Sequence, residues 1–247
     1  MSGVSDAQRP GRDPGQNPGR DPDLAPDLAP AEPSTQTPAE FWEERYAGTE
    51  RVWSGRVNPA LAAVAADWSP GRSLDLGCGE GGDALWLAEH GWTATGIDLS
   101  PSAIARASAE AERRGLSGIT FVAADLVAWA RDPAPIDRGA AGFDLVTASF
   151  LQSPVEFPRE RVLRAAADRV VPGGRLVVLA HATAPSWADA AHAHHDFPTP
   201  EQELMALGLD PAAWRIEVAE VRERAIPAPD GTPGTIGDTV VVAERLG

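Results

Sequence analysis

A glycine-rich turn and the acidic residues around it carry the clearest chemical signal in this sequence. The stretch LDLGCGEGGDALWLAEHGWTATGIDLS (74–100) places Gly77, Gly79 and Gly82 in a G-x-G-x-x-G pattern directly after an apolar run. Glycines let the backbone turn sharply and let a ligand approach it closely. Asp98 ends the next apolar run, where a carboxylate can accept hydrogen bonds from both hydroxyls of a ribose. The spacing therefore predicts a nucleoside-binding turn.

Two further carboxylates distinguish between the cofactors that use such a turn, NAD and S-adenosylmethionine. Asp75 lies two residues before the first glycine, where it would repel a pyrophosphate but suit a ligand that carries an ammonium and a sulfonium group. Asp125 ends a third apolar run, FVAADL (121–126), where it can accept a hydrogen bond from the amino group of adenine. The residues therefore favour S-adenosylmethionine.

The turn belongs to a region in which strand and helix patterns alternate. Alternating strands and helices indicate an α/β protein with a parallel sheet and helices on both faces. We predict strands over 73–77, 93–98, 119–124, 143–149 and 175–181, and helices between them over 82–90, 101–114 and 158–170.

The two ends of the chain depart from this alternation. Short helices are predicted over 38–47 and 58–68, and another near 200–207. The runs 214–225 and 235–246 read as strands joined by a turn-rich loop, and consecutive strands of that kind pair antiparallel. We therefore expect a mostly parallel sheet with one reversed strand near an edge.

Composition bounds the partners and the location. The 247 residues carry a formal net charge of −15, which repels phosphate backbones, so neither nucleic acid nor an anionic membrane surface is expected as a partner. Cys78 is the single cysteine, so no internal disulfide can form. No apolar run approaches the ~18 residues of a membrane span, and the N-terminus lacks a signal-peptide pattern. We expect a cytoplasmic protein. Its oligomeric state is left open, with a monomer favoured.

Residues 1–37 differ in kind from the rest. They are dominated by proline, glycine and aspartate and contain few large apolar residues, so they cannot bury enough surface to offset the entropy of ordering. We predict a disordered tail over 1–37 and one domain over 38–247. A docking segment for a partner is the alternative reading of the tail.

The motifs of residues 38–247 resemble those of the class I S-adenosylmethionine-dependent methyltransferases. DLGCGEGG is similar to the first motif of that family, IDLS and AADL to its second and third acidic positions, and FDLVTASF and VPGGRLVVLAHA to its fourth and fifth strands. The resemblance implies a Rossmann-like three-layer sandwich with a seven-stranded sheet in the order 3-2-1-4-5-7-6, strand 7 being antiparallel. It also implies these cofactor-binding residues: Asp75, Gly77, Gly79, Asp98, Leu99, Asp125, Leu126 and Ser149.

The segment FWEERYAGTERVWSGRVNPAL (41–61) resembles the N-terminal part of the thiopurine and tellurite-resistance methyltransferases, in which an aromatic helix and loop close over the cofactor. An aromatic face stabilises a sulfonium, and an arginine can grip the methionine carboxylate. The resemblance makes candidates of Trp42, Arg45, Tyr46, Trp53 and Arg56, of which Trp53 and Arg45 are predicted to bind the cofactor. In the alternative reading, Trp42 and Tyr46, four residues apart, simply pack on the core.

The sequence predicts no firm catalytic side chain. A thiol, with a pKa of about 8.5, is substantially ionised near neutral pH, so a soft nucleophile needs no general base. His181 follows the fifth strand at the edge where ligands bind, and is a weak candidate for a base or a substrate contact. Ser149, Phe150 and Gln152 follow the fourth strand, and at least one of them is expected to line the cleft.

A metal site is not predicted. His192, His194 and His195 in HAHHDF fall within four residues, but no second cluster supplies the remaining ligands of a zinc site. A loop beside the substrate cleft is the preferred interpretation. Cys78 is interpreted as a small residue that fits the turn.

The favoured function is methyl transfer from S-adenosylmethionine to a small molecule. The resemblance of the N-terminal segment implies a thiol, selenium, tellurium or thiopurine-like acceptor. Three alternatives remain open: an NAD-dependent oxidoreductase, which Asp75 and Asp125 disfavour, a binding protein of the same fold without turnover, and a methyltransferase acting on a protein partner.

Overall fold

A seven-stranded sheet forms the centre of the computed structural model, which describes residues 36–48, 51–137, 142–188, 197–228 and 230–247. Its strand order is β3-β2-β1-β4-β5-β7-β6, and β7 runs antiparallel to both of its neighbours. The predicted order and the reversal of the seventh strand are therefore confirmed. The strands are β1 (Arg72–Leu76), β2 (Thr93–Asp98), β3 (Ile119–Ala123), β4 (Phe143–Ser149), β5 (Val170–His181), β6 (Trp214–Pro227) and β7 (Pro233–Arg245).

Helix starts follow the capping signals of the sequence. Thr37, Asn58, Ser100 and Thr199 each accept a backbone hydrogen bond as N-caps, and a proline stands in the first turn after each. A side-chain oxygen satisfies an orphan N–H there, and proline has no N–H to lose. The helices are α1 (Pro38–Tyr46), α2 (Pro59–Ala65), α3 (Gly82–Glu89), α4 (Pro101–Arg114), α5 (Leu126–Trp129), α6 (Ala134–Asp137), α7 (Arg159–Asp168) and α8 (Pro200–Leu207).

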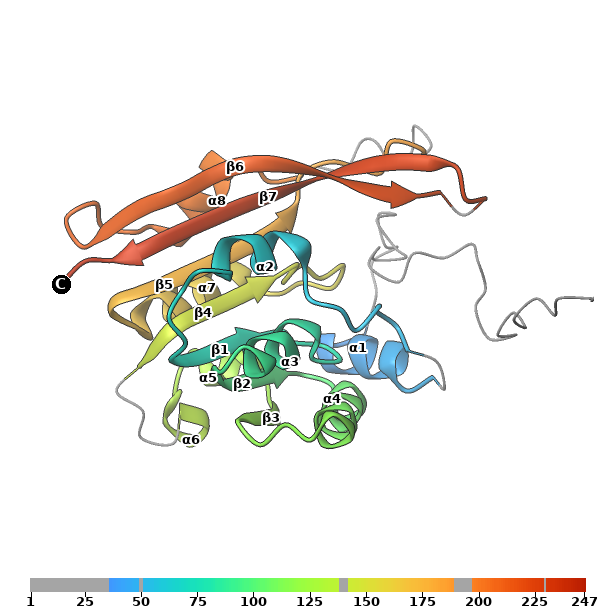
Figure 1. The fold of residues 1–247 in the computed structure, drawn as a ribbon, viewed down its shortest axis with the longest axis horizontal. Coiled ribbons are helices and arrows are strands. Elements are labelled where there is room, and N and C mark those ends of the chain that lie inside the picture. Colours follow the sequence, from blue (N-terminus) through green and yellow to red (C-terminus); the bar gives the residue numbers. More distant parts are fainter. Residues whose placement is uncertain (1–35, 49–50, 138–141, 189–196, 229) are drawn as a thin grey trace, which may run out of the picture.

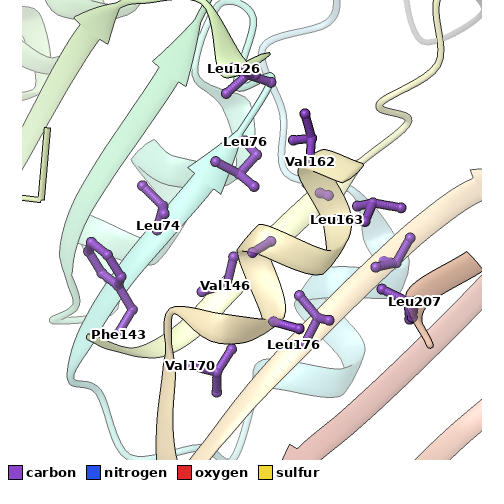
Figure 2. Packing of buried hydrophobic residues seen from close by; sticks show 14 of the residues in the cluster. Leu74, Leu76, Leu126, Phe143, Val146, Val162, Leu163, Val170, Leu176 and Leu207 are labelled. Atoms are coloured by element: carbon purple, nitrogen blue, oxygen red, sulfur yellow. The ribbon is translucent and has the colours of Figure 1, made fainter. Parts of the chain in front are cut away.

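Helices cover both faces of the sheet and bury two apolar clusters. On one face, Val162 and Leu163 of α7 and Leu207 of α8 pack against strand residues such as Val146 and Leu176 (Figure 2). On the other face, α2 packs against β5 and α3 packs against β1 and β2, and the cluster continues over residues of β4 and β7. The result is the three-layer sandwich that the alternation predicts.

Three details of the structure differ from the prediction. The fifth strand begins at Val170, not at 175, because Val170 already pairs with Phe143 before a register shift in β4. The helix predicted over 158–170 correspondingly ends at Asp168. Helices α5 and α6 were not expected, since four residues are too short to show a helical period.

Strands β6 and β7 form a long two-stranded ribbon that reaches past the other strands on the side of α1 (Figure 1). Residues 224 and 238 of this ribbon thereby come close to the carboxyl end of β5. Of the predicted tail, residues 1–35 lie outside the described residues, and Thr37 belongs to the cap of α1. Within the described ranges, no helix is long and apolar enough to cross a membrane.

Candidate active site

In the glycine turn after β1, the backbone N–H groups donate hydrogen bonds to other parts of the protein. Gly77 and Gly79 adopt positive φ values of +69° and +52°, which favour glycine. The N–H groups of Gly77 and Cys78 both donate to the carbonyl of Ile97, at 2.8 and 2.9 Å, and that of Gly79 donates to Asp98. Because these donors are occupied, this stretch of the turn presents carboxylates rather than N–H groups to a ligand, which disfavours a pyrophosphate.

Asp98, at the end of β2, holds the turn to the strand. Its Oδ2 accepts the Gly79 N–H at 2.8 Å and its Oδ1 accepts the Ser100 N–H at 2.9 Å. Burial raises the pKa of Asp98, and the N–H donors of Ser100 and Gly79 lower it in part. The carboxyl lines the cavity described below, in the position predicted for contact with ribose.

Asp75 is a buried carboxyl in which only one of the two oxygens accepts a hydrogen bond from the described residues. Its Oδ1 accepts from the Thr147 hydroxyl at 2.8 Å, whereas Oδ2 is buried without a hydrogen-bond partner among the described residues. Burial, followed by the neighbouring charge of Asp83, raises the pKa of Asp75 to about 8. A cationic group bound here would relieve both effects.

Asp83, in the first turn of α3, connects three parts of the site. Its Oδ1 accepts the backbone N–H of Asn58 at 2.7 Å, and its Oδ2 accepts the Ser149 hydroxyl at 2.6 Å. Ser149 is thereby positioned at the end of β4, where the sequence predicts a cofactor contact. Asp83 is not among the residues predicted from sequence. Its place in the first helical turn after the glycines is a signal by which it could have been found.

The N-terminal segment is fastened to the glycine turn by Glu80. This carboxylate accepts the backbone N–H groups of Val52 and Trp53 at 3.1 and 3.0 Å, and pairs with Arg106 of α4 at 2.8 Å. Glu80 is only 1% exposed. The sequence did not reveal this role, because Glu80 bonds to residues 27 and 28 positions away.

Tyr46 and Trp53 cover the turn directly. The indole N–H of Trp53 donates to the Tyr46 hydroxyl at 2.5 Å, and both groups lie where a side chain at Gly79 would project. Tyr46 is buried, which raises the pKa of its hydroxyl well above the usual range. Tyr46 therefore packs as the alternative reading expected, and also lines the cavity.

Helix α1 docks on the start of α4 through Glu43. Its carboxylate accepts from the hydroxyls of Ser100 and Ser102, both at 2.5 Å. These hydrogen bonds, that of Ser100 foremost, lower the pKa of Glu43. On the same helix, the Trp42 indole donates to Ser153, beyond β4, at 3.3 Å. Segments before β1 and after β4 thus enclose the site together.

The two arginine candidates occupy different places. The guanidinium of Arg45 lies over the rings of Trp42 and Trp53, 5.8 and 5.6 Å from their centroids, and is not among the described residues that line the cavity. Arg56 does line it. Of the two arginines, Arg56 is therefore the one that contributes to the cavity lining.

These parts surround one cavity of about 1080 Å³ at the carboxyl ends of the parallel strands. Pockets for single ligands span roughly 300–1000 Å³, so this one has room for a cofactor and an acceptor together. Among the predicted cofactor residues, the lining contains Asp75, Gly77, Gly79, Asp98, Leu99, Asp125, Leu126, Ser149 and Trp53. Asp125 also caps α5 by accepting the Val127 N–H at 2.7 Å.

The end of the cavity formed by the segments after β4 and β5 contains aromatic and other apolar side chains. Phe150, Phe157 and Pro227 line it together with Gln152, whereas Leu151 lies where a side chain at Gly77 would project. His181 also lines this end and is 4% exposed, with its ring stacked on that of Phe150 at 4.3 Å between centroids. The sequence prediction that at least one of Ser149, Phe150 and Gln152 lines a cleft agrees with this lining.

The histidine cluster of the sequence cannot be placed, since His192, His194 and His195 lie outside the described residues. Within the described ranges, no group of three or more histidine, cysteine, aspartate or glutamate side chains could hold a metal ion. Burial raises the pKa of the Cys78 thiol well above its ordinary value, which keeps the sulfur in its unreactive protonated form.

Residues 74–174 match the model of a family described as a methyltransferase domain. Among curated proteins, 157 residues are 36% identical to 2-heptyl-1-hydroxyquinolin-4(1H)-one methyltransferase of Mycobacteroides abscessus, over 59% of this chain and 65% of that protein. A stretch of 130 residues is 32% identical to ribosomal RNA small subunit methyltransferase C of Alcanivorax borkumensis, over 51% of this chain and 37% of that protein. The chain thus spans less than two thirds of either relative.

Solved structures share the fold over most of the chain. A protein studied in the conversion of a disulfide bond into a thioacetal group during echinomycin biosynthesis is 26% identical with a TM-score of 0.63, covering 84% of this chain and 93% of that one. TehB from Haemophilus influenzae is 16% identical with a TM-score of 0.58, covering 85% and 67%. NodS from Bradyrhizobium japonicum, an N-methyltransferase solved with S-adenosyl-L-homocysteine, is 20% identical with a TM-score of 0.53, covering 83% and 99%.

Proposed function

The chain carries a class I, S-adenosylmethionine-dependent methyltransferase domain, and on that premise we propose that it transfers a methyl group from S-adenosylmethionine to a small-molecule acceptor. The observation that carries the proposal is the ring of buried carboxylates at the glycine turn, with Asp75 Oδ2 left without a partner among the described residues. A cation fits this place, and the cofactor offers one in the ammonium of its methionine part.

If the ammonium of the cofactor lies at Asp75, the other cofactor contacts can be assigned to residues of the lining. Asp75 would accept from the ammonium group, Asp98 from the ribose hydroxyls and Asp125 from the adenine amino group. Gly77 and Gly79 would let the ligand approach the backbone, while Leu99 and Leu126 would flank the adenine. Ser149 would face the methionine part, and Arg56, rather than Arg45, would pair with its carboxylate.

When bound, S-adenosylmethionine supplies a methyl group on a sulfonium, which is already a good leaving group. The protein then has to align the acceptor and exclude water. Trp53 and Tyr46 lie over the turn and would shield it from solvent. The aromatic side chains of Phe150 and Phe157 would hold an apolar acceptor at the other end of the cavity.

A small acceptor is favoured over a macromolecule. Aromatic side chains such as Phe150 and Phe157 line the cavity, and the chain carries a net charge of −15, which disfavours RNA. The name of the Mycobacteroides abscessus relative describes a methyltransferase for a small heteroaromatic compound, and the echinomycin study concerns sulfur chemistry. Ribosomal RNA methyltransferases also match, so RNA is the second candidate.

The proposal also includes the acceptor atom, the bounds of the catalytic domain and the cellular location. The resemblance of residues 41–61 to thiopurine and tellurite-resistance enzymes supports a sulfur, selenium or tellurium nucleophile, and we propose a single catalytic domain over 38–247 in the cytoplasm. An NAD-dependent oxidoreductase is disfavoured because the backbone donors of residues 77–79 are already occupied.

Transfer of a radiolabelled methyl group from S-adenosylmethionine tests the proposal. The full chain is incubated with separate pools of thiols, selenite, tellurite, hydroxylated heteroaromatic compounds and ribosomal RNA. Label appearing in a small-molecule pool, with equimolar S-adenosylhomocysteine, supports the function. Label in the RNA pool alone would overturn the small-molecule assignment, and binding of S-adenosylhomocysteine without transfer to any pool would favour the reading as a binding protein.

A further inference from the structure

Three side chains at the apolar end of the cavity form a buried chain of polar contacts. His181 at the end of β5 contacts Asp238 of β7 through Nδ1, with 3.2 Å between Nδ1 and Oδ1. Arg224 of β6 donates from Nε to the other oxygen of Asp238 at 2.6 Å. Asp238 is 2% exposed. The charges of Asp238 and Arg224 balance, so the network needs no charge on the imidazole.

This network fixes which nitrogen of His181 carries the proton. A carboxylate oxygen with no proton can only accept, so Nδ1 is the donor to Asp238. In the neutral ring, Nε2 then holds a lone pair and acts as an acceptor. His181 is among the residues that line the cavity, so this lone pair belongs to a side chain of the cavity wall.

The backbone on the other side of the imidazole is held in an unusual conformation. Phe150 has a φ of +52° and is the one non-glycine residue with positive φ in the described ranges. Its N–H donates to the Leu179 carbonyl at 2.8 Å and its carbonyl accepts from Gln152 at 2.7 Å. Such a conformation in a bulky residue costs free energy and is common at functional sites. Here it places the phenyl ring flat against His181.

A purely structural clamp between these strands would not need a histidine. At the other end of the same strands, Arg175 of β5 pairs with Glu217 of β6 at 2.8 Å, and Glu244 of β7 lies beside them. That ion pair ties the three strands with arginine and glutamate alone, at the surface. The network at His181 instead lies in the cavity wall, where both His181 and Arg224 contribute to the lining.

We propose that His181 is the general base of methyl transfer, oriented by Asp238 and Arg224, and that the acceptor is a phenol-type hydroxyl on an aromatic or heteroaromatic ring. This rests on the methyl transfer proposed above and takes oxygen, in place of sulfur, selenium or tellurium, as the acceptor atom. A phenol, with a pKa of about 10, is protonated at neutral pH, so it gains most from a base. Soft nucleophiles that are already ionised would have no use for this network.

Methyl transfer with His181 as the base moves one proton and one methyl group. The acceptor O–H gives its proton to His181 Nε2, and the oxygen lone pair forms the new O–CH₃ bond. The C–S bond of the donor breaks with its electron pair on sulfur, which leaves neutral S-adenosylhomocysteine. The imidazolium that forms is stabilised by Asp238, and it returns its proton to solvent when the product leaves.

The first test needs neither cofactor nor acceptor. Long-range ¹H–¹⁵N NMR of the histidine-labelled full chain, at pH 7.5, reports which ring nitrogen is protonated. The signal of His181 is the one lost in His181→Asn. We expect protonation at Nδ1 and a lone pair at Nε2, and a change of tautomer in Asp238→Asn. A ring protonated at Nε2 in the wild type would overturn the proposal.

The second test measures how the loss depends on the acceptor. Rates of wild type and His181→Asn are compared on substituted phenols whose pKa values run from about 7 to about 10. We expect the ratio of rates to grow from a few-fold at the acidic end to about 10²–10⁴-fold at the other, in the range typical of general-base catalysis. A ratio that stays constant across the series, or methylation of thiols with no phenol methylated, would overturn the proposal.

Two controls separate this outcome from misfolding and from failure of the methyltransferase assignment. His90→Gln changes another histidine, which stacks on Trp86 at the end of α3, and should leave every rate unchanged. Calorimetry with S-adenosylhomocysteine should give equal affinities for wild type and His181→Asn. Absence of binding in the wild type would refute the methyltransferase function itself, whereas binding together with the wrong tautomer refutes only the role of His181.

Discussion

The two ends of the cavity are built in different ways. At the cofactor end, the acidic residues Asp75 and Asp98 stand within one βαβ unit, beside a turn whose glycines are set by local sequence. At the acceptor end, His181 meets a carboxylate 57 positions away on an antiparallel strand. The first end is set by a short local motif, whereas the second is assembled from residues far apart in the sequence. We therefore expect specificity for the acceptor to lie in the second end.

The largest effect is expected at the fastening of the N-terminal segment to the cofactor end. Glu80→Ala removes a buried carboxylate that serves Arg106 and two backbone N–H groups, and should lower the free energy of unfolding by about 3–5 kcal/mol. Chemical denaturation measures this loss. The matched control is Glu160→Ala, whose surface pair with Arg164 is worth about 0–1 kcal/mol. Equal losses in both variants would contradict the fastening role.

The next largest effect is expected at the cofactor end of the cavity. Asp98→Ala should weaken binding of S-adenosylhomocysteine by about 1–3 kcal/mol, since a charged acceptor of hydrogen bonds is lost. Isothermal calorimetry gives the value directly. Asp144→Ala removes a carboxylate that accepts the Arg72 N–H at 2.7 Å and does not line the cavity, and should leave the affinity unchanged. An unaltered affinity in Asp98→Ala would show that the ribose contact is assigned to the wrong residue.

A pH-dependent effect, which is smaller when it is counted per pH unit, is expected at Asp75. Its pKa is about 8 in the folded protein and about 3.9 in an unfolded chain, so between these values the folded state binds more protons. The free energy of unfolding of the ligand-free protein should therefore fall as pH rises from about 4 to about 8, by up to about 1.4 kcal/mol per pH unit. Denaturation curves across this range measure it. Asp75→Asn should flatten the slope, and an identical slope in that variant would refute the assignment.

The smallest effect is expected from the N-terminal tail. Removing residues 1–35 leaves the cap of α1 at Thr37 intact, so the midpoint of thermal unfolding should change by no more than about 2 °C. Differential scanning calorimetry of the full and shortened chains decides this. A drop of several degrees would show that the tail packs on the domain and contributes to its stability.

The sequence predicted the fold well because its signals were local. The caps Thr37, Asn58 and Ser100, each followed by proline, mark helix starts, and the alternation of apolar runs marks a parallel sheet. The junction at 168–175 was placed wrongly because VVPGG lacks a strand-like pattern, although Val170 pairs with Phe143. That pairing depends on the neighbouring strand, which local sequence does not report.

The residues of the candidate site also differ in whether local sequence identifies them. Asp75 and Asp98 could be singled out from spacing alone, whereas Asp238 in TIGDTVVV gave no signal of its own. Only the antiparallel register, in which Asp238 is the direct partner of His181, brings these residues together. Arg45 is a third case: its position on the predicted helix is confirmed and its guanidinium lies over two indole rings, while its contact with the cofactor stays a prediction.

The central claim is that the glycine turn binds S-adenosylmethionine through its carboxylates. Calorimetric titration of the full chain with S-adenosylhomocysteine at pH 7, in two buffers of different ionisation enthalpy, tests it most directly, with NAD as the parallel ligand. We predict micromolar binding of S-adenosylhomocysteine, release of up to one proton as the ammonium lowers the pKa of Asp75, and no binding of NAD. Binding of NAD, or no binding of S-adenosylhomocysteine, would contradict the claim.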